Sequence, residues 1–334
     1  MVMKSLSELE VLDLRHFSAR QLRPLLEEEG RVWAERLRWD YRSSTELLLQ
    51  YLDSRVLPGL VALCRGRICG YAFCVYEGNK AVVGDAYALQ DEPGGPLPVE
   101  DKLLCHLIEM LQNSPNISRI ESQLLLHDSG EMNARFVAAG FAIYPRLFLE
   151  CSFKKKPRLP LLRAGEAAPV LPSNLKMQGW SNANYQAAGE LIHACYQGHM
   201  DSTINDQYRT LHGSLRFLHN IVRFPGCGVF DPESSVVLVD QRTGVLEGMV
   251  LCSRVSAEMG HITQICVAPH LRGNRYGRML LQQCALELAR RGFDGITLTV
   301  TEANRHAINL YEELGFVVRH RFDAMVWNRD PASA

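Results

Sequence analysis

Residues 260–316 read GHITQICVAPHLRGNRYGRMLLQQCALELARRGFDGITLTVTEANRHAINLYEELGF, and this stretch decides the fold. Its first part, HITQICVAP, is an apolar run with β-branched residues that Pro269 closes, which predicts a buried strand ending at Val267 or Ala268. The run RMLLQQCALELARR that follows repeats its apolar residues at helical spacing. A strand therefore leads through a short basic loop with glycines into a helix.

The loop between this strand and this helix has the features of an anion site. The first amides of a helix have no partner within the helix, and the helix dipole is positive at that end. Gly273 and Gly277 let the backbone come close to a ligand, and positive charge comes from Arg272, Arg275 and Arg278. We expect a pyrophosphate here, and the alternative is a plain solvated turn.

The second part of the stretch predicts another strand, GITLTV, and a second helix that ends at Gly315. Asn304, Ala307, Tyr311 and Gly315 are three or four residues apart, so they share one face of that helix. An amide, a small residue and a phenol therefore point the same way.

Together the two parts resemble the core of the GCN5-related N-acetyltransferase (GNAT) superfamily. The family's pyrophosphate loop reads (Gln/Arg)-x-x-Gly-x-(Gly/Ala). Arg272 and Gly277 match its ends, but Arg275 stands where the family usually has its first Gly. The family's next motif, Asn-x-x-Ala-x-x-x-Tyr-x-x-x-Gly-Phe, matches without a gap at Asn304, Ala307, Tyr311, Gly315 and Phe316. The resemblance implies an α/β fold that transfers an acetyl group from acetyl-coenzyme A directly to an amine.

The resemblance also implies which residues hold the cofactor. The loop amides would meet the pyrophosphate, and the strand end would pair with the pantetheine amides. The implied cofactor-binding residues are Cys266, Val267, Ala268, Arg272, Gly273, Asn274, Arg275, Tyr276, Gly277, Arg278, Asn304 and Tyr311. The Tyr311 phenol would hydrogen-bond the leaving sulfur, with a core aromatic as the alternative, and Asn304 would touch the cofactor or only cap its helix.

The attacking ammonium needs a proton acceptor, and the sequence leaves three candidates open. His261 is six residues before Val267 on the cofactor strand and has a suitable pKa. Glu302, at the mouth of the next strand, is the second catalytic candidate, and a water chain is the third.

The wall of the acceptor site in this fold usually comes from the loop between the first two helices. Here that loop reads YQGHMDSTINDQY. Two carboxylates beside the acetyl group would suit a cationic amine, and the alternative is an ordinary polar loop. The expected substrate-binding residues are Tyr196, Asp201, Asn205 and Asp206.

Length and composition limit the number of domains, the classes of partner and the compartment that we expect. The chain has 334 residues, which favours two domains, and a formal net charge of −1, which predicts no nucleic-acid or membrane partner. No apolar run approaches the roughly 20 residues that span a bilayer, and the first residues lack a signal-peptide core. The ten cysteines follow no Cys-x-x-Cys or metal spacing. We expect a cytoplasmic protein with reduced thiols and no metal.

The first half of the chain repeats the order of elements in the second, and Gly140-Phe141 corresponds to Gly315-Phe316. This order predicts a tandem duplication, in which each copy is a mixed, twisted β-sheet flanked by helices. The expected division is a first domain at 1–153, a linker with lysines and prolines at 154–173, and a second domain at 174–334.

The first copy lacks the chemistry of the second. Phe136 and Ser129 replace the phenol and the amide of the second motif, and the loop QDEPGGPLPVEDKLL carries carboxylates, among them Glu100, that would repel a pyrophosphate. We therefore expect a degenerate first copy and a catalytic second copy that acetylates a primary amine of a small molecule or peptide. The alternative is a non-catalytic acyl-coenzyme A sensor. The layout is similar to that of the mycothiol synthases, and the acceptor and the oligomeric state stay open.

Overall fold

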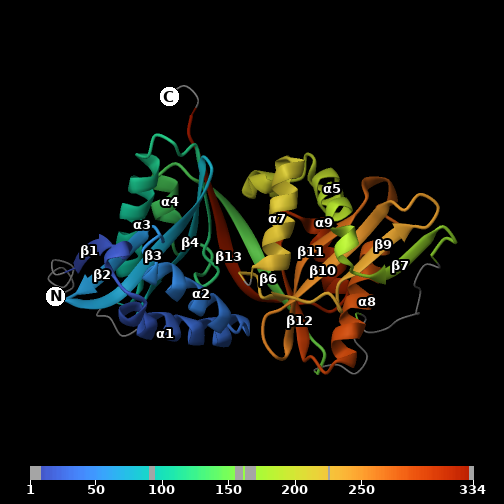
Figure 1. Ribbon diagram of the computed structural model, residues 1–334, viewed down its shortest axis with the longest axis horizontal. Coiled ribbons are helices and arrows are strands. Elements are labelled where there is room, and N and C mark those ends of the chain that lie inside the picture. The colour runs from blue at the N-terminus through green and yellow to red at the C-terminus, as the bar shows by residue number, and fades with distance from the viewer. Residues whose placement is uncertain (1–8, 90–94, 155–160, 162–170, 225, 331–334) are drawn as a thin grey trace. The chain divides into compact units, whose positions relative to one another are not determined.

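The computed structural model describes residues 9–89, 95–154, 161, 171–224 and 226–330. It divides into two compact units, whose chain can be followed by colour in Figure 1. Unit 1 comprises residues 1–37, 41–146 and 321–334, and unit 2 comprises residues 38–40 and 147–320. None of the described helices is long and apolar enough to cross a membrane.

Unit 1 is a mixed sheet with helices on both faces. Its strands follow the spatial order β1 (Leu9–Asp13), β2 (Gly59–Cys64), β3 (Arg67–Glu77), β4 (Lys80–Ala88), β5 (Arg119–Gln123) and the last part of β13 (Val317–Asn328). Its helices are α1 (Ala19–Leu37), α2 (Arg42–Asp53), α3 (Leu97–Gln112) and α4 (Asn133–Ala138). Ala72 and Cys74 of β3 join the core under α3, whereas Tyr71, which points to the opposite face, donates its hydroxyl to Glu29 of α1.

Unit 2 is likewise a mixed sheet with helices on both faces. Its strands follow the order β6 (Ala142–Ser152), β12 (Gly295–Thr301), β11 (Met259–Val267), β10 (Leu246–Arg254), β9 (Val236–Asp240) and β7 (Leu175–Gly179), and β8 (Val229–Phe230) pairs with β10. Its helices are α5 (Tyr185–Tyr196), α6 (Asp201–Ile204), α7 (Leu211–Arg223), α8 (Tyr276–Arg290) and α9 (Arg305–Glu313).

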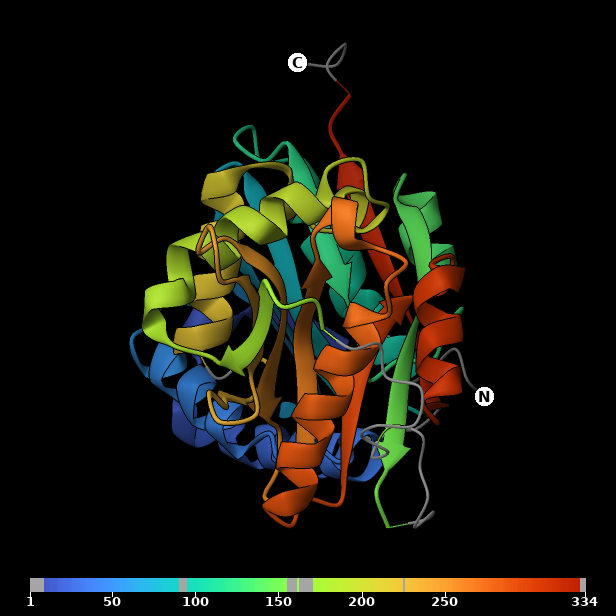
Figure 2. The same cartoon turned by 90° about the vertical axis from the view of Figure 1, so that its right-hand side faces the viewer.

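Alternate residues of β10 separate two cores in unit 2. Val250 and Cys252 pack with α8 and α9, and Met249 and Leu251 pack with α5 and α7. In Figure 2 the orange helix α8 lies across the face of the strands that is turned to the viewer. Because both faces of the sheet are covered, its strands are apolar over most of their length, as the sequence pattern predicts.

The central parallel strands of unit 2 separate at one end. Residues 259–262 of β11 pair with residues 295–298 of β12, but β11 continues to Val267 along β10. The register between β10 and β11 shifts at Thr263, which is an extra residue on the β11 side. Such a bulge bends a strand and increases its twist, so it marks the point where β11 leaves β12.

Unit 1 repeats this feature. Residues 80–83 of β4 pair in parallel with residues 119–122 of β5, and the register of β4 against β3 shifts at Gly84, directly after the paired section. The same device in both halves supports the predicted duplication. The predicted fold class, two tandem α/β domains that each hold a mixed sheet flanked by helices, is confirmed.

The last strand of each half belongs to the compact unit of the other half. Residues 147–152 of β6 lie in unit 2, where the next residue, Phe153, donates its N–H to the carbonyl oxygen of Asp294 at 2.7 Å. Residues 324–328 of β13 lie in unit 1 and pair with β5. The compact units therefore do not follow the expected boundaries at 153 and 174, because each unit includes a strand segment from the other half of the chain. Of the expected linker, only residues 154, 161 and 171–173 are among those described.

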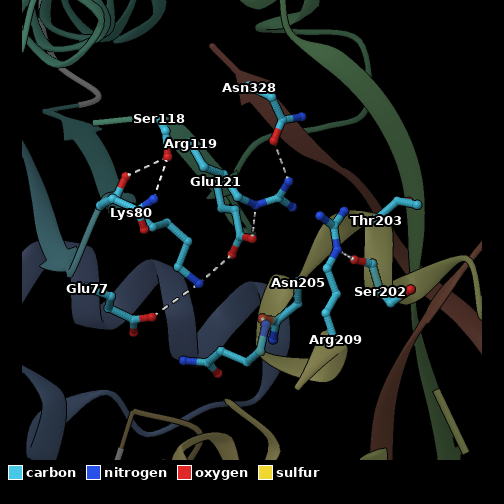
Figure 3. A network of polar contacts seen from close by, with 12 residues as sticks. Glu77, Lys80, Ser118, Arg119, Glu121, Ser202, Thr203, Asn205, Arg209 and Asn328 are labelled. Atoms are coloured by element: carbon cyan, nitrogen blue, oxygen red, sulfur yellow. Dashed lines mark hydrogen bonds and ion pairs between the residues drawn. The ribbon is translucent and has the colours of Figure 1, made fainter. Parts of the chain in front are cut away.

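A buried ionic network ties the end of β13 into unit 1. The Lys80 ammonium lies 3.1 Å from a carboxylate oxygen of Glu77 and 3.1 Å from one of Glu121. Arg119 links Glu121, at 2.6 Å, to the side-chain oxygen of Asn328 on β13, at 2.8 Å (Figure 3). Because buried charges are costly unless they are paired, this network helps to fix the position of the exchanged strand.

Candidate active site

The candidate site begins at the end of β11 beyond the bulge at Thr263. Residues 264–267 keep their register with β10, and the register with β12 ends at Ile262. The backbone of this segment can therefore accept an extended ligand on the side that β12 has left, in the way that a sheet edge accepts a peptide. Cys266, Val267 and Ala268, which the sequence predicts to bind the cofactor, lie on this segment.

The start of α8 lies directly beyond this strand end. Arg275 is its N-cap residue and makes no side-chain cap hydrogen bond, since a guanidinium has no acceptor. Arg275 has φ 62°, and Gly273 has φ 83°. Arg275 thus holds a left-handed conformation. A glycine, which is the residue that the GNAT motif has at this position, would adopt this conformation without strain.

The side chains of the loop have different surroundings. Arg272 donates to the carbonyl oxygen of Cys195 at 2.9 Å and so joins the loop to α5. Arg278 donates to Glu313 of α9 at 3.2 Å, and Asn274 donates to the carbonyl oxygen of Leu271 at 3.1 Å. The Tyr276 side chain is buried in the core, so only its backbone could meet a ligand.

Tyr311 faces the same region from α9. Its ring is buried and packs against Phe316 with 5.8 Å between the ring centroids. Burial, and then the nearby charges of Asp201 and Cys266, raise the pKa of Tyr311 above its ordinary value. The phenol therefore stays protonated at neutral pH and can donate a hydrogen bond. Asn304 is the N-cap of α9 and accepts the N–H of Ala307 at 3.2 Å, which is the capping role.

The predicted acceptor loop reaches the site through Asp201. The hydroxyl of Thr301, the last residue of β12, donates to the Asp201 carboxylate at 2.5 Å. Burial chiefly raises the pKa of Tyr196, and the charge of Asp201 acts in the same direction, as it does for Tyr311. Asp201 of the loop and Thr301 of β12 are thus brought together.

The other two predicted loop residues lie on the next turn. Asn205 caps the short 3-10 helix η6 (Asp206–Arg209), where its side chain accepts the N–H of Gln207 at 3.0 Å, and Asp206 is the first residue of that helix. Figure 3 shows Asn205 near Arg209, which donates to the carbonyl oxygen of Ser202 at 2.8 Å. The contacts of Asn205 are those of a helix cap, so they do not assign it to a ligand.

His261 lies in the paired section of β11, before the bulge. Its Nδ1 is 2.8 Å from the Thr297 hydroxyl, and its ring packs against Trp39 and Phe148 at 5.0 and 5.8 Å between centroids. Burial lowers the pKa of His261 to about 3. Because a general base works best with a pKa near the working pH, this environment disfavours His261 in that role. Glu302 follows β12 directly and is half-buried.

Several residues of the site carry no distinctive signal in the sequence. Thr301 ends a strand, Cys195 is one apolar residue on a helix, and Tyr208 stacks on Tyr196 with 4.0 Å between their ring centroids. Gln264 donates to the sulfur of Cys266 at 3.2 Å. Only the position of Thr301, at the carboxyl end of a predicted parallel strand, could have indicated a site residue.

The corresponding place in unit 1 is filled by protein side chains. Glu100 of α3 accepts the backbone N–H of Ala88 at the end of β4 at 3.0 Å, and its other oxygen lies 3.1 Å from Nε2 of the buried His127. Ala88 pairs with β3 as Val267 pairs with β10. An amide that an extended ligand would need is thus taken by a carboxylate. Phe136 is fully buried and packs edge-on against Phe141.

Comparisons with known proteins agree with this geometry. Residues 194–316 match the model of the Acetyltransferase (GNAT) family. A GCN5-related N-acetyltransferase from Sphaerobacter thermophilus has a similar structure, with a TM-score of 0.67, 16% identity and 96% of each chain covered. A tandem GNAT protein from the clavulanic acid biosynthesis pathway gives a TM-score of 0.59 at 14% identity, covering 97% of this chain and 99% of that one.

A putative acetyltransferase from Pyrococcus horikoshii gives a TM-score of 0.53 at 10% identity, covering 97% of this chain and 90% of that one. Identities this low show the fold alone. No curated protein sequence matches this chain. No group of three or more His, Cys, Asp or Glu suited to a metal ion occurs in the part of the chain that the structure describes.

Proposed function

This chain belongs to the GNAT superfamily, whose members transfer acyl groups from acyl-coenzyme A, and we propose that it is an acetyl-coenzyme A dependent N-acetyltransferase with its active site in unit 2. One observation carries the proposal. The strand that leaves its parallel neighbour after Ile262 leads through the 3-10 helix η7 (Pro269–Leu271) and a short loop to the start of α8, whose N-cap residue makes no side-chain cap hydrogen bond. A strand end and a helix start in this order can hold a pantetheine arm and a pyrophosphate together.

The cofactor would be held mainly by backbone groups. The amides at the start of α8 would bind the pyrophosphate, with Arg275 adding positive charge. Residues 266–268 would pair with the pantetheine amides, which brings the thioester toward Tyr311. Unit 1 would not hold a second molecule, because Glu100 takes the amide of Ala88.

The transfer itself needs a free amine, an electrophilic thioester and a stabilised leaving group. The amine nitrogen attacks the thioester carbonyl carbon, the C–N bond forms and the C–S bond breaks. A thiol has a pKa of about 8.5, well below that of the buried phenol, so Tyr311 would stabilise the thiolate as a hydrogen-bond donor and keep its own proton. The nitrogen releases its remaining extra proton to solvent as the amide forms, and the thiolate takes up one proton from solvent, so the two balance.

Asp201 is our assignment for the proton acceptor. Thr301 holds its carboxylate at the end of β12, and the charge of this carboxylate contributes to the raised pKa of both Tyr196 and Tyr311. A carboxylate at this place would attract a primary ammonium and take its proton as the nitrogen attacks. Glu302 is the alternative base, and burial disfavours His261. The acceptor would be a primary amine of a small molecule or of a peptide N-terminus.

The test is the release of coenzyme A thiol from acetyl-coenzyme A, measured against a panel of small amines and peptides. Release that depends on an acceptor supports the transferase. Tight binding of acetyl-coenzyme A without acceptor-dependent release from any amine would favour a non-catalytic sensor. Competition between acetyl-coenzyme A and longer acyl thioesters would identify the acyl group.

A further inference from the structure

Two cysteines of unit 1 lie in contact across one hairpin. Cys64 is the last residue of β2 and Cys69 is the third residue of β3, and their sulfur atoms are 2.8 Å apart. Cys64 is half-buried, whereas Cys69 is fully buried. Cys69 belongs to the core under α3 and Cys64 packs against that core, so the two side chains share one face of the sheet.

The turn of the hairpin fixes how its strands pair. Arg65 and Gly66 form the turn, with φ of 52° and 76°. Left-handed values at both central positions are those of a type I′ turn, whose twist matches that of two paired antiparallel strands. The turn sets Cys64 opposite Arg67, so β2 and β3 are paired from the last residue of β2.

A bulge then sets the position of Cys69. Ala62 pairs with Gly70, two residues beyond the partner of Leu63, so Cys69 is an extra residue on the β3 side. The Cys69 thiol donates to the carbonyl oxygen of Ala62 at 3.4 Å. The hairpin backbone thus holds the two sulfur atoms where a shift of only about 0.8 Å would give an S–S bond of about 2.05 Å.

We propose that Cys64 and Cys69 are a redox site, which forms a reversible disulfide by exchange with a small-molecule disulfide of the glutathione class. The more accessible Cys64 loses its proton and attacks one sulfur of the external disulfide, whose S–S bond breaks, and one external thiolate leaves. Cys69 then loses its proton and attacks the Cys64 sulfur, and the second external thiolate leaves. The two thiolates take up two protons. Two cysteines are oxidised and one external disulfide is reduced.

The bond would fasten the β2–β3 hairpin within its sheet. Cys64 pairs on its other side with Leu9 of the edge strand β1, and the Cys69 carbonyl oxygen accepts the N–H of Leu89, directly after β4, at 2.9 Å. The bond would therefore join the two middle strands of the series β1 to β4. A disulfide restricts the unfolded chain, so the oxidised protein should unfold less readily. Because the pair lies in unit 1, the proposal does not rest on the proposed function.

The test equilibrates the full chain in a buffer of oxidised and reduced glutathione, blocks the remaining thiols and maps the cysteines by peptide mass spectrometry without reduction. Trypsin cuts after Arg65, so Cys64 and Cys69 fall on separate peptides. We expect these peptides to be cross-linked, with a mass about 2 Da below their reduced sum, and to separate after dithiothreitol. The exposed Cys227 should carry glutathione, which shows that the exchange reached the protein.

Cys69→Ala and Cys74→Ala are a matched pair of variants. Both residues are fully buried on β3 and belong to the same core, so each variant removes one sulfur from similar surroundings. Cys69→Ala should lose the cross-link and leave glutathione on Cys64, whereas Cys74→Ala should form the cross-link as the unchanged protein does. In urea, the unfolding equilibrium constant of the oxidised protein should be roughly tenfold lower than that of the reduced protein.

Three results would overturn the proposal. The first is that Cys64 and Cys69 stay thiols in a buffer that puts glutathione on Cys227. The second is a cross-link of Cys64 that persists in Cys69→Ala, and the third is an oxidised protein that unfolds as readily as the reduced one. If Cys69→Ala fails to fold, fragmentation of the cross-linked peptides from the unchanged protein still distinguishes Cys69 from Cys74.

Discussion

At the scale of single residues, Tyr311 is the side chain whose environment most closely matches its proposed role. Replacing it with Phe should keep the fold, because unit 1 holds Phe136 at the corresponding place with the same kind of aromatic neighbour. We expect Tyr311→Phe to lower turnover by about 100-fold, the usual cost of removing one hydrogen-bond donor to a developing anion. The dissociation constant for acetyl-coenzyme A, measured by calorimetry, should hardly change. A turnover equal to that of the unchanged protein would remove the role of the phenol.

Asp201 allows a second prediction at this scale. Asp201→Asn keeps an oxygen for the Thr301 hydroxyl but removes the charge that would attract and deprotonate an ammonium. We expect kcat/KM for the amine to fall by about 100-fold or more, as for the loss of a general base.

Asn205→Ala is the matched control for Asp201. It removes the cap of η6 and should cost about 1 kcal/mol of stability with little change in rate. Equal kinetic losses in both variants would contradict the assignment of Asp201.

The sequence alone predicts part of the site at this scale. Tyr311 and Asn304 belong to one local motif, so their spacing is enough to place them on the face of one helix. His261 could not be assessed in this way. Its pKa depends on Trp39 and Phe148, which come from distant segments and bury the imidazole. The meeting of Asp201 with Thr301 likewise depends on how a loop folds against a strand.

At the scale of elements, the start of α8 should bind the diphosphate of the cofactor. Arg275→Glu places a negative charge beside these amides, and we expect it to weaken acetyl-coenzyme A binding by roughly tenfold, with less effect on turnover at saturation. Arg290→Glu makes the same charge change at the other end of the helix and should leave the affinity unchanged. Unchanged affinity in Arg275→Glu, measured by calorimetry, would contradict the pyrophosphate site.

Unit 1 holds a pair of buried acids, Asp85 on the bulged strand β4 and Glu29 on α1, that should make stability depend on pH. Burial raises the pKa of Asp85 to about 6 from an ordinary value of 3.8. Burial also raises the pKa of its partner Glu29 on α1. The native state therefore binds the proton more strongly than the unfolded state. The stabilisation is complete below pH 3.8 and is lost as the pH rises through about 6. The shift corresponds to about 3 kcal/mol.

Asp85→Asn removes this titration. We expect the variant to gain stability relative to the unchanged protein as the pH rises from 3.8 to about 6, by up to about 3 kcal/mol in urea denaturation, and to keep that gain at higher pH. The Asn side chain can still accept the hydrogen bond from the Ala86 N–H that Asp85 accepts at 2.8 Å. A stability difference that does not vary with pH would show that the pKa of Asp85 is not raised in the native state.

Sequence patterns identified the elements themselves well, because helices and strands have distinct apolar periods. The bulges at Thr263 and Gly84 left no pattern, since one extra residue in a buried strand changes neither its composition nor its length noticeably. These two residues nevertheless decide where the parallel strands separate.

At the scale of the whole molecule, the exchanged strands make the two halves of the chain depend on each other. A fragment of residues 1–153 lacks residues 324–328, which pair with β5 and bring the buried Met325 into unit 1. A fragment of residues 174–334 lacks residues 147–152 of unit 2. We expect neither fragment to fold cooperatively, as measured by circular dichroism and thermal unfolding, because each would expose an apolar strand edge.

Fragments 1–173 and 174–334, produced together, contain all strands of both units and should reassemble into a complex that unfolds at a single transition. Cooperative unfolding of fragment 1–153 alone would show that the exchanged strand is dispensable. The exchange could not be predicted, because the pattern of a strand gives its faces but not its neighbour in the sheet.

Under the proposed function, the exchange also explains how the half without catalytic groups can persist over evolutionary time. After duplication, a Phe in place of the phenol and a carboxylate on the Ala88 amide would cost no activity as long as the other half worked. Deletion of that half would remove residues 147–152 and leave residues 324–328 without a partner strand. Natural selection would therefore tolerate the decay of its chemistry but not its loss from the gene.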